Sequence, residues 1–385
     1  MSAFLRVPET VGPRTRATQE RVRDLFLAQP GLDRRAERLL RTAFDGSAIE
    51  SRGTVISALD DAATGGDGVF VGPGRELLQP GTAARNDAYL REGTPLAVEA
   101  ARRALAAAPD IDPAEITHLI TVSCTGFRSP GPDLEIVSAL GLRPEVQRYH
   151  LGFMGCAAAI QALRAAAQFC TADPAAVVLI VSLEVCTIHL RSSTEPDAII
   201  SSSLFADGAA AALVTGRPPA AAVHGAELDS FGTVVAAEGE EHMSWTIGDH
   251  GFEMVLSTAV PRVIGSHARR ALSALCADDP SLHLSCEEET LPATARHWAI
   301  HPGGREILDR LQHEVGLSDA QLAPSRDVLR DHGNMSSATV LFVLRRILEG
   351  PDLHTGERIV AMAFGPGLTM EGAVLTALGG ADAAS

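Results

Sequence analysis

Apolar segments of strand length alternate with helical segments along most of this chain, and this alternation limits its possible folds most strongly. Strands are expected at 118–124, 175–183, near 221–230, and at 297–301, 358–364 and 370–377, with another apolar segment at 204–216. Helical periodicity covers 18–45, 94–107, 132–140, 257–276, 304–315 and 335–348. This order predicts an α/β protein. The short Arg-Pro-Pro segment at 217–219 suggests a boundary, so we expect a first half at 1–219 and a second half, at 220–385, that repeats its plan.

The chain is acidic, with 48 acidic residues, 32 basic residues and a net charge of −16. An acidic protein is a poor general ligand for nucleic acid or for anionic membranes. The N-terminal segment MSAFLRVPETVGPR lacks the apolar core of a secretory signal, and the apolar runs are too short to span a bilayer. The sequence therefore predicts a cytoplasmic protein without nucleic-acid partners or membrane insertion.

The cysteines and histidines show no spacing that is typical of a metal site. The six cysteines form no CxxC pair, which predicts reduced thiols; they are Cys124, Cys156, Cys170, Cys186, Cys276 and Cys286. No HExxH motif is present, and no GxGxxG motif opens a helix after a strand. We therefore expect neither a metal nor a bound cofactor.

Cys156 is the strongest candidate for a nucleophile. It ends the glycine-punctuated segment LGFMGC, and the helical pattern AAAIQAL begins directly after it. The free N–H groups and the positive dipole at a helix N-terminus stabilise a thiolate, which can carry an acyl group. Taken by itself, the residue is equally compatible with a small buried hydrophobe. The apolar helix that follows is suited to burial between two sheets.

Two further residues fit the same chemistry. His301 ends a predicted strand in HWAIHPGG, which places its side chain at the crevice where α/β proteins bind ligands. Asn334 follows Gly333 and opens an apolar helix in GNMSSATVLFVL. A core histidine and a helix-capping asparagine are the structural alternatives. Together, a thiol that holds an acyl chain and two donors that stabilise an enolate oxygen would serve a decarboxylative condensation in a dry site.

The residues of several motifs, and the order in which they occur, resemble those of one enzyme family. The motifs are VSCTGFRSPGPD, GFMGCAAAI, LEVCTIHL, SLFADGAAAALV, HPGGREILD, RDHGNMSSATVLFVL and FGPGLTMEGAVL, between about residues 85 and 377. The chain thereby resembles the type III polyketide synthases, or chalcone synthase-like enzymes. The resemblance implies a thiolase-like five-layered αβαβα sandwich with two pseudo-duplicated halves, a homodimer, and a catalytic triad of Cys156, His301 and Asn334. It also implies substrates that are CoA thioesters, namely an acyl-CoA starter and malonyl-CoA.

The resemblance also assigns residues to the substrate pocket. Phe205 matches a gatekeeper phenylalanine that flanks the malonyl carboxylate, and Met254 stands where plant enzymes carry a second one. Trp245 falls where those enzymes have a glycine that lines the elongation cavity. These departures imply a reshaped pocket, because methionine is slimmer than a phenyl ring and more flexible.

Three smaller residues complete the predicted pocket. Cys124 and His189 both replace threonines of the plant enzymes, and Ser336 keeps a serine beside the triad. Several segments look closest to bacterial members that make alkylpyrones or alkylresorcinols from fatty acyl-CoA. We therefore expect a fatty starter and a pyrone, resorcinol or related ring as the product.

An arginine-rich segment at 34–52 has two interpretations. It forms either a solvated helix face or a patch that binds CoA phosphates, for which Arg41 and Arg52 are the leading candidates. Two other functions stay open beside the main one. A ketoacyl-ACP synthase of the third kind shares the Cys-His-Asn triad but stops after one condensation, and a type III synthase with an aromatic starter differs only in its pocket.

Overall fold

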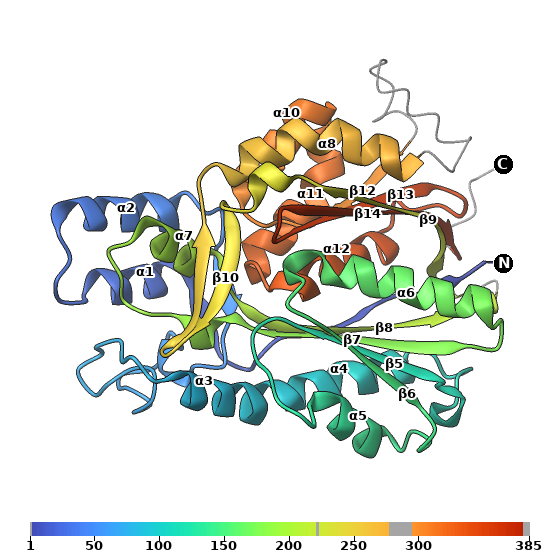
Figure 1. Ribbon diagram of the computed structural model, residues 1–385, viewed down its shortest axis with the longest axis horizontal. Coiled ribbons are helices and arrows are strands. Elements are labelled where there is room, and N and C mark those ends of the chain that lie inside the picture. The colour runs from blue at the N-terminus through green and yellow to red at the C-terminus, as the bar shows by residue number, and fades with distance from the viewer. Residues whose placement is uncertain (1, 221–222, 277–294, 380–385) are drawn as a thin grey trace.

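The computed structural model describes residues 2–220, 223–276 and 295–379, and these build five stacked layers (Figure 1). The layers follow the order helix, strand, helix, strand, helix. This is the α/β class that the alternating pattern predicted and the layer order that the family resemblance implied. Within the described ranges, no helix combines the length and the apolar character that a membrane span needs.

The strands form two leaves of one sheet. The first leaf contains β6 (Gln147–Gly152), β5 (His118–Ser123), β7 (Val177–Val185) and β8 (Asp207–Thr215), with β2 (Glu9–Val11) beside β8. The second contains β12 (His297–Ile300), β13 (Arg358–Gly365), β14 (Thr369–Leu378) and β9 (Gly225–Val235). β1 (Phe4–Arg6) pairs with both β8 and β9 and so joins the leaves into one ten-stranded sheet.

The two leaves repeat the same local plan. In the first, β5 and β7 are parallel, and β8, the next strand in the chain, pairs with β7 in the antiparallel direction. In the second, β12 and β13 are parallel and β13 continues into the antiparallel strand β14. Each plan includes one central helix, α6 (Ala158–Ala172) before β7 and α12 (Thr339–Leu348) before β13. The structure thus shows the two pseudo-duplicated halves, whereas the exact boundary after residue 219 stays a prediction.

The central helices lie between the leaves, and other helices cover the outside (Figure 1). α4 (Thr94–Ala106) and α5 (Pro132–Leu140) cover the first leaf, while α8 (Val260–Cys276) and α10 (Arg305–Val315) cover the second. α11 (Asp319–His332) packs beside β12 and α12. The buried face of α6 is mainly alanine, which allows the sheet to approach the helix closely on both sides.

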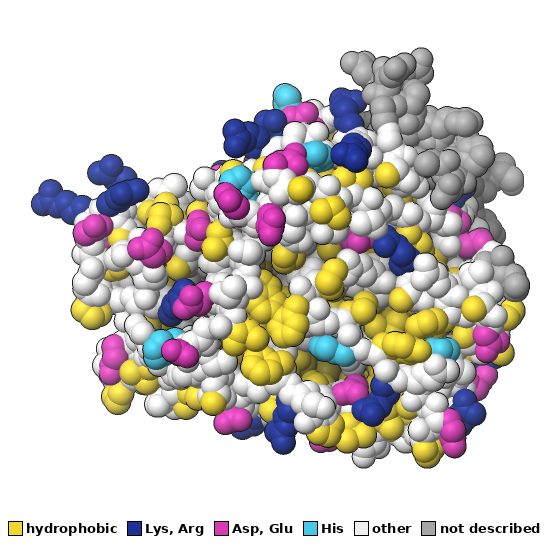
Figure 2. All heavy atoms as spheres, viewed as in Figure 1, with side chains coloured by type: hydrophobic (Ala, Val, Ile, Leu, Met, Phe, Trp, Pro, Cys, Tyr) yellow, Lys and Arg dark blue, Asp and Glu magenta, His cyan; other side chains and the backbone are white. Residues whose placement is uncertain are grey.

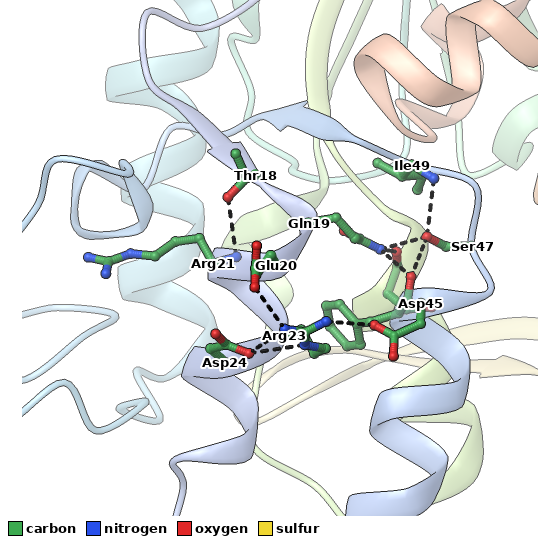
Figure 3. Close-up of polar contacts among 11 residues, drawn as sticks. Thr18, Gln19, Glu20, Arg21, Arg23, Asp24, Asp45, Ser47 and Ile49 are labelled. Atoms are coloured by element: carbon green, nitrogen blue, oxygen red, sulfur yellow. Dashed lines mark hydrogen bonds and ion pairs between the residues drawn. The ribbon is translucent and has the colours of Figure 1, made fainter.

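The remaining elements gather at the end of the molecule where the central helices begin (Figure 1). They are β3 (Arg16–Thr18), β4 (Ser51–Gly53), α1 (Gln19–Leu27), α2 (Arg34–Asp45), α3 (Thr82–Ala88), α7 (Pro196–Leu204), and the hairpin of β10 (Met243–Gly248) and β11 (Gly251–Leu256). The prediction of one continuous helix at 18–45 was wrong. The chain forms two helices there, α1 and α2, and Gly31 between them adopts a φ of 84°. Thr18 does cap α1, as expected, by accepting a hydrogen bond from the Arg21 N–H (Figure 3).

Candidate active site

Cys156 lies in a single 3-10 turn that leads directly into α6. The chain before it bends sharply, because Phe153 and Gly155 each adopt a φ of 63°. A side chain at position 155 is excluded, since its Cβ would lie 2.4 Å from Cδ of Pro366. The prediction that Cys156 stands at the start of a helix is therefore confirmed, and Gly155 allows the loop that carries Pro366 to pass beside it.

His301 follows the last residue of β12 and is only 1% exposed. Its backbone N–H donates to the Met362 carbonyl at 2.8 Å, which continues the pairing with β13. Its carbonyl accepts from the Gly303 N–H at 3.0 Å in the turn that follows. Neither ring nitrogen has a hydrogen-bond partner among the described residues. Because buried polar atoms are normally satisfied, these two nitrogens mark a place for a ligand.

Asn334 is held by the backbone on both sides. Gly333 adopts a φ of 72° as α11 ends, and the Asn334 N–H donates to the Leu204 carbonyl at 3.0 Å. The side-chain Oδ1 accepts from the Ser336 N–H at 2.8 Å, and Nδ2 donates to the Gly303 carbonyl at 3.3 Å. These contacts fix the amide plane and leave one N–H of Nδ2 for another acceptor.

Cys156, His301 and Asn334 line one cavity, here called the catalytic cavity. Its other walls are largely apolar and include Met243, Leu256 and Phe364. The cavity connects three distant parts of the chain, which come from the N-terminus of α6, the end of β12 and the end of α11. The triad residues that the sequence singled out are thus brought together, although their roles in a reaction remain predictions.

Both titratable members of this trio are neutral at rest. Burial raises the pKa of the Cys156 thiol to about 12, although hydrogen bonds with Ser336 and Asn334 act in the opposite direction. Burial also lowers the pKa of His301 to about 3. The resting thiolate that the sequence analysis inferred from the helix terminus is therefore not supported, because desolvation outweighs the helix dipole.

A buried carboxyl group behind the catalytic cavity was missed by the sequence analysis. Glu184 lies within the wholly buried strand β7 and is itself 0% exposed. It accepts from the Cys124 N–H at 3.0 Å, from the Thr125 hydroxyl at 2.9 Å, and from the Ser337 hydroxyl. Burial raises the pKa of Glu184. One charged residue inside an apolar strand, in VVLIVSLEV, was the signal that could have identified it.

This network continues to the nucleophile. The Cys124 sulfur lies 3.3 Å from the Ser336 hydroxyl, and the Cys156 thiol donates to the same hydroxyl at 3.5 Å. Ser336 has a φ of 46°, which turns it toward both sulfurs. Ser336 thus lies beside Cys156, as the sequence analysis expected, and Cys124 links it to the buried Glu184, which the sequence analysis did not foresee.

A second cavity, here called the side cavity, adjoins the catalytic cavity. The two share five lining residues, which are Cys124, Phe205, Trp245, Met254 and Ser336. Phe205 is buried, at 9% exposure, whereas Met254 and Trp245 are half-buried on the β10–β11 hairpin, where they form a cross-strand pair. The structure therefore brings the predicted pocket residues to one wall.

His189 lies in the side cavity, but both of its ring nitrogens are occupied. Nε2 lies 2.7 Å from the Thr125 carbonyl, and Nδ1 accepts from the Phe252 N–H at 3.2 Å. Burial lowers the pKa of His189 to about 4, so the ring is neutral. It stacks on Phe252 at 4.2 Å between ring centroids, and Trp245 stacks on Phe252 at 5.0 Å. Phe252, which the sequence analysis did not single out, holds this wall together.

A third cavity, here called the entrance cavity, lies between α2, α7, α8 and α10. It shares Leu256, Gly303 and Ile307 with the catalytic cavity, so the two adjoin. Its remaining walls include Leu39 and Thr42 of α2. The entrance cavity thus reaches the wall of the cavity that Cys156 lines.

The two arginines predicted to bind CoA phosphates do not line the entrance cavity. Arg52 is 0% exposed and donates to the carbonyls of Ser202 and Phe205, both at 2.8 Å. Its assignment was wrong, because a side chain enclosed by backbone carbonyls cannot reach a phosphate. Arg41 is exposed, but the helical repeat places it on the opposite flank of α2 from Leu39 and Thr42.

The remaining cysteine predictions concern thiols away from the catalytic cavity. Among the described residues, Cys170 and Cys186 are free and buried, and Cys186 lines the side cavity. Cys286 lies outside the described residues, as does the side chain of Cys276.

Family models match both halves of the chain. The model of the N-terminal domain of chalcone and stilbene synthases matches residues 75–218. The model of the C-terminal domain of chalcone and stilbene synthases matches residues 228–379. The chain belongs to the chalcone and stilbene synthase family. It is therefore a type III polyketide synthase, and these enzymes are acyltransferases. The resemblance noted in its motifs is confirmed for the family.

Characterised relatives agree with the family. The chain is 32% identical over 361 residues to the Alpha-pyrone synthesis polyketide synthase-like Pks18 of Mycobacterium tuberculosis, covering 92% of this chain and 84% of the relative. It is 32% identical over 302 residues to 1,3,6,8-tetrahydroxynaphthalene synthase of Streptomyces griseus, covering 78% and 77%. A Dictyostelium discoideum relative, Probable polyketide synthase 1, is 33% identical over 264 residues, or 69% of this chain, but the match spans only 8% of that protein.

Solved structures confirm the thiolase-like architecture. The C-terminal type III polyketide synthase domain of Steely1, a type I/III hybrid from Dictyostelium, has a TM-score of 0.87 at 26% identity, covering 98% of this chain and 100% of that domain. The 1,3,6,8-tetrahydroxynaphthalene synthase of Streptomyces coelicolor has a TM-score of 0.82 at 26% identity, covering 97% and 99%. Relatives with this fold thus make different products, so the product of this enzyme must be argued from its own pocket.

Proposed function

We propose that this type III polyketide synthase loads a fatty acyl group onto Cys156, extends it with malonyl-CoA, and releases a pyrone, a resorcinol or a related ring. One observation carries the proposal: a thiol, an unpartnered imidazole and an oriented amide line a single, mostly apolar cavity. Each supplies one of the functions that decarboxylative condensation requires.

Loading begins with the transfer of a proton from the Cys156 thiol to His301. The thiolate then attacks the carbonyl carbon of the acyl-CoA, and the CoA sulfur leaves with the proton held by His301. Because both groups are neutral at rest, this exchange creates charge only while the thioester is bound. His301 is neutral again at the end and keeps one ring N–H.

Extension uses the two remaining donors. The neutral His301 N–H and the free Nδ2–H of Asn334 bind the thioester oxygen of malonyl-CoA, where negative charge develops as CO2 leaves. The enolate carbon attacks the acyl group on Cys156 and expels the sulfur as a thiolate. This thiolate can attack the lengthened thioester in the next round, so the cycle repeats without another base.

The cavity walls favour a fatty starter over an aromatic one. Trp245, stacked on Phe252, narrows one side of the pocket, and the flexible Met254 forms another. An apolar channel stabilises an unbranched chain by about 0.8 kcal/mol for each buried CH2 group. A relative named for alpha-pyrone synthesis supports the same class of product.

The decisive experiment measures kcat/KM for saturated acyl-CoA starters from hexanoyl to palmitoyl, with p-coumaroyl-CoA as the aromatic competitor and products identified by mass spectrometry. We expect kcat/KM to rise with chain length and then to fall sharply where the channel ends. Trp245→Gly should move that limit to longer starters or permit another malonyl extension, whereas Trp298→Phe, in a buried site away from the cavities, should not. An aromatic starter that outcompetes every fatty acyl-CoA would overturn the fatty assignment.

The same experiment separates this function from a single condensation of the ketoacyl-ACP synthase kind. A type III synthase yields products with at least two malonyl-derived units, and a single-condensation enzyme yields only one. The absence of a cofactor or metal from the reaction stays a prediction. Activity that survives dialysis against EDTA would support it, and activity restored only by added metal would contradict it.

We propose that Arg35 and Arg38, rather than Arg41 and Arg52, meet the CoA phosphates. They precede Leu39 and Thr42 by one helical turn and therefore share the flank of α2 that lines the entrance cavity. Charge reversal of both should raise KM for acyl-CoA with little change in kcat, because phosphate contacts persist from the ground state to the transition state. An unchanged KM would contradict the assignment.

We propose a homodimer that forms through the edge of the first leaf. β6 is the last strand of that leaf, and its residues 147–150 are exposed. Phe153 and Met154, directly after β6, are 43% and 42% exposed, which is high for large apolar side chains. Light scattering should give twice the monomer mass, and Met154→Arg should shift it toward the monomer. A monomeric wild-type enzyme would contradict the proposal.

A further inference from the structure

α2 carries a stripe of exposed arginines, which are Arg34, Arg35, Arg38 and Arg41. Figure 2 shows dark-blue side chains gathered at this end of the molecule. Within the described part of the chain, none of the four has an ion pair or a side-chain hydrogen bond. Exposed arginines elsewhere, such as Arg103 with Glu99 and Arg217 with Glu115, do pair with a carboxylate. Other exposed arginines, such as Arg128 and Arg143, also have no ion pair among the described residues, but α2 gathers four on one helix in a chain with a net charge of −16.

Most of the carboxylates next to the stripe are already engaged, and Glu37, exposed on α2 itself, is the exception. Arg23 of α1 pairs with Glu20 at 3.3 Å, with Asp24 at 2.9 Å and with Asp45 at 2.8 Å (Figure 3). Asp33 caps α2 and accepts from the Ala36 N–H at 2.7 Å. Because one arginine of α1 pairs with three nearby acidic groups, only Glu37 offsets the four arginines, and the outside of α2 keeps an excess of positive charge for a partner.

The stripe extends beyond the reach of a CoA molecule in the entrance cavity. Arg35 and Arg38 lie nearer to the flank of α2 that continues the cavity wall, whereas Arg34 and Arg41 lie farther around the helix from it. A ligand that enters the cavity contacts the first pair. The second pair needs a partner that covers the outer surface of the helix.

We propose that α2 docks an acidic carrier protein, which delivers an acyl group on a phosphopantetheine arm through the entrance cavity to Cys156. This inference rests on the proposed function. The four arginines extend over eight residues, or about 10 Å of helix, and match carboxylates spaced one turn apart on a partner helix. An anionic membrane is disfavoured, because the exposed residues of α2 are all polar and none could insert among lipid chains.

The experiment compares two donors of the same acyl group. The double variant R34E/R41E and the wild-type enzyme receive dodecanoyl groups either from a bacterial fatty-acid acyl carrier protein or from CoA, and acylation of Cys156 is followed by intact mass. We expect kcat/KM with the carrier protein to fall by about tenfold or more in the variant. With dodecanoyl-CoA it should change by less than about twofold, because Arg34 and Arg41 lie away from the cavity. The wild-type rate with the carrier protein should also fall as salt is added.

Two sets of control variants establish that the loss comes from the charge on α2. Arg102→Glu, on α4 of the opposite outer layer, should leave both donors unaffected, and Arg34→Lys with Arg41→Lys should retain most of the rate with the carrier protein. Urea unfolding of R34E/R41E should match the wild type, because both residues are exposed and unpaired.

Each contrary outcome has a definite meaning. A wild-type enzyme that accepts dodecanoyl-CoA but takes nothing from the carrier protein would overturn the docking proposal and leave the proposed function intact. Equal losses of kcat/KM with both donors in R34E/R41E would also overturn it. So would a variant that keeps both values of kcat/KM and loses only its binding to phosphatidylglycerol vesicles. If neither donor acylates Cys156, the proposed function itself fails.

Discussion

The catalytic cavity and the buried network behind it are both polar clusters in an apolar interior, but they satisfy their polar atoms differently. Glu184 accepts hydrogen bonds from three neighbours, including a backbone N–H. His301 has no partner at either ring nitrogen among the described residues, and the Cys156 thiol makes only weak contacts, with Asn334 and, at 3.5 Å, with the Ser336 hydroxyl. Unsatisfied buried groups cost stability, so a site that keeps them retains them for a substrate.

This difference separates two kinds of mutational effect. Changes at Cys156 or His301 should alter rates and leave the folded state nearly as stable, because these two side chains make few contacts with the described protein. Changes at Glu184 should lower stability first, because several donors lose their acceptor. The following predictions test this separation, starting with the largest effect.

Cys156→Ala should abolish product formation, because no acyl-enzyme can form. His301 and Asn334 remain, so slow decarboxylation of malonyl-CoA should survive and can be measured as release of CO2. Cys170→Ala, which alters a buried thiol away from the cavities, is the matched control and should retain elongation. Elongation at a near wild-type rate in Cys156→Ala would show that another residue is the nucleophile.

Asn334→Ala should show the converse behaviour. Loss of one donor to the enolate oxygen should slow decarboxylation by about 10²–10³-fold. Loading of a starter onto Cys156 should continue, because it does not use that donor. The two steps are separated by measuring CO2 release and acyl-enzyme formation on the same preparation. An equal loss in both steps would mean that Asn334 mainly supports the structure of the cavity.

The pH dependence of thiol alkylation tests the neutral resting state. Because burial raises the pKa of Cys156 to about 12, the rate with iodoacetamide should rise about tenfold per pH unit from pH 7 to 9. The fold favours the protonated thiol, so the contribution of this group to stability is present below its unfolded pKa of 9.0 and is lost as pH rises above it. A rate that levels off within this range would indicate a thiolate stabilised by the helix terminus.

Glu184→Ala should lower the free energy of unfolding by about 3 kcal/mol, because the donors that it satisfies are left unpaired. Urea unfolding measures this loss. Cys156→Ala should change the same quantity by less than about 1 kcal/mol, since its thiol makes only weak hydrogen bonds, with Ser336 and Asn334. A stable Glu184→Ala enzyme that has lost its activity would contradict the comparison and place Glu184 among the catalytic groups.

The sequence predicted those features that depend on local geometry. Cys156, His301 and Asn334 each stand at the end of a helix or strand beside a glycine or a glycine-containing turn, so the motif alone placed them. Phe252 and Glu184 were missed because their importance depends on contacts between segments far apart in the chain. Arg52 was misassigned for the same reason, since only the fold shows that carbonyls of residues 202–205 surround it. The pKa of Cys156 likewise depends on burial, which the helix terminus alone did not reveal.

The most direct test of the proposed mechanism identifies which sulfur carries the acyl group. The wild-type enzyme is incubated with dodecanoyl-CoA without malonyl-CoA, digested at low pH, and its peptides are sequenced by mass spectrometry. We predict one dodecanoyl thioester on Cys156 and none on Cys124, although the two sulfurs share the Ser336 hydroxyl. A dodecanoyl group on Cys124, or an enzyme that forms product without an acyl group on Cys156, would contradict this mechanism.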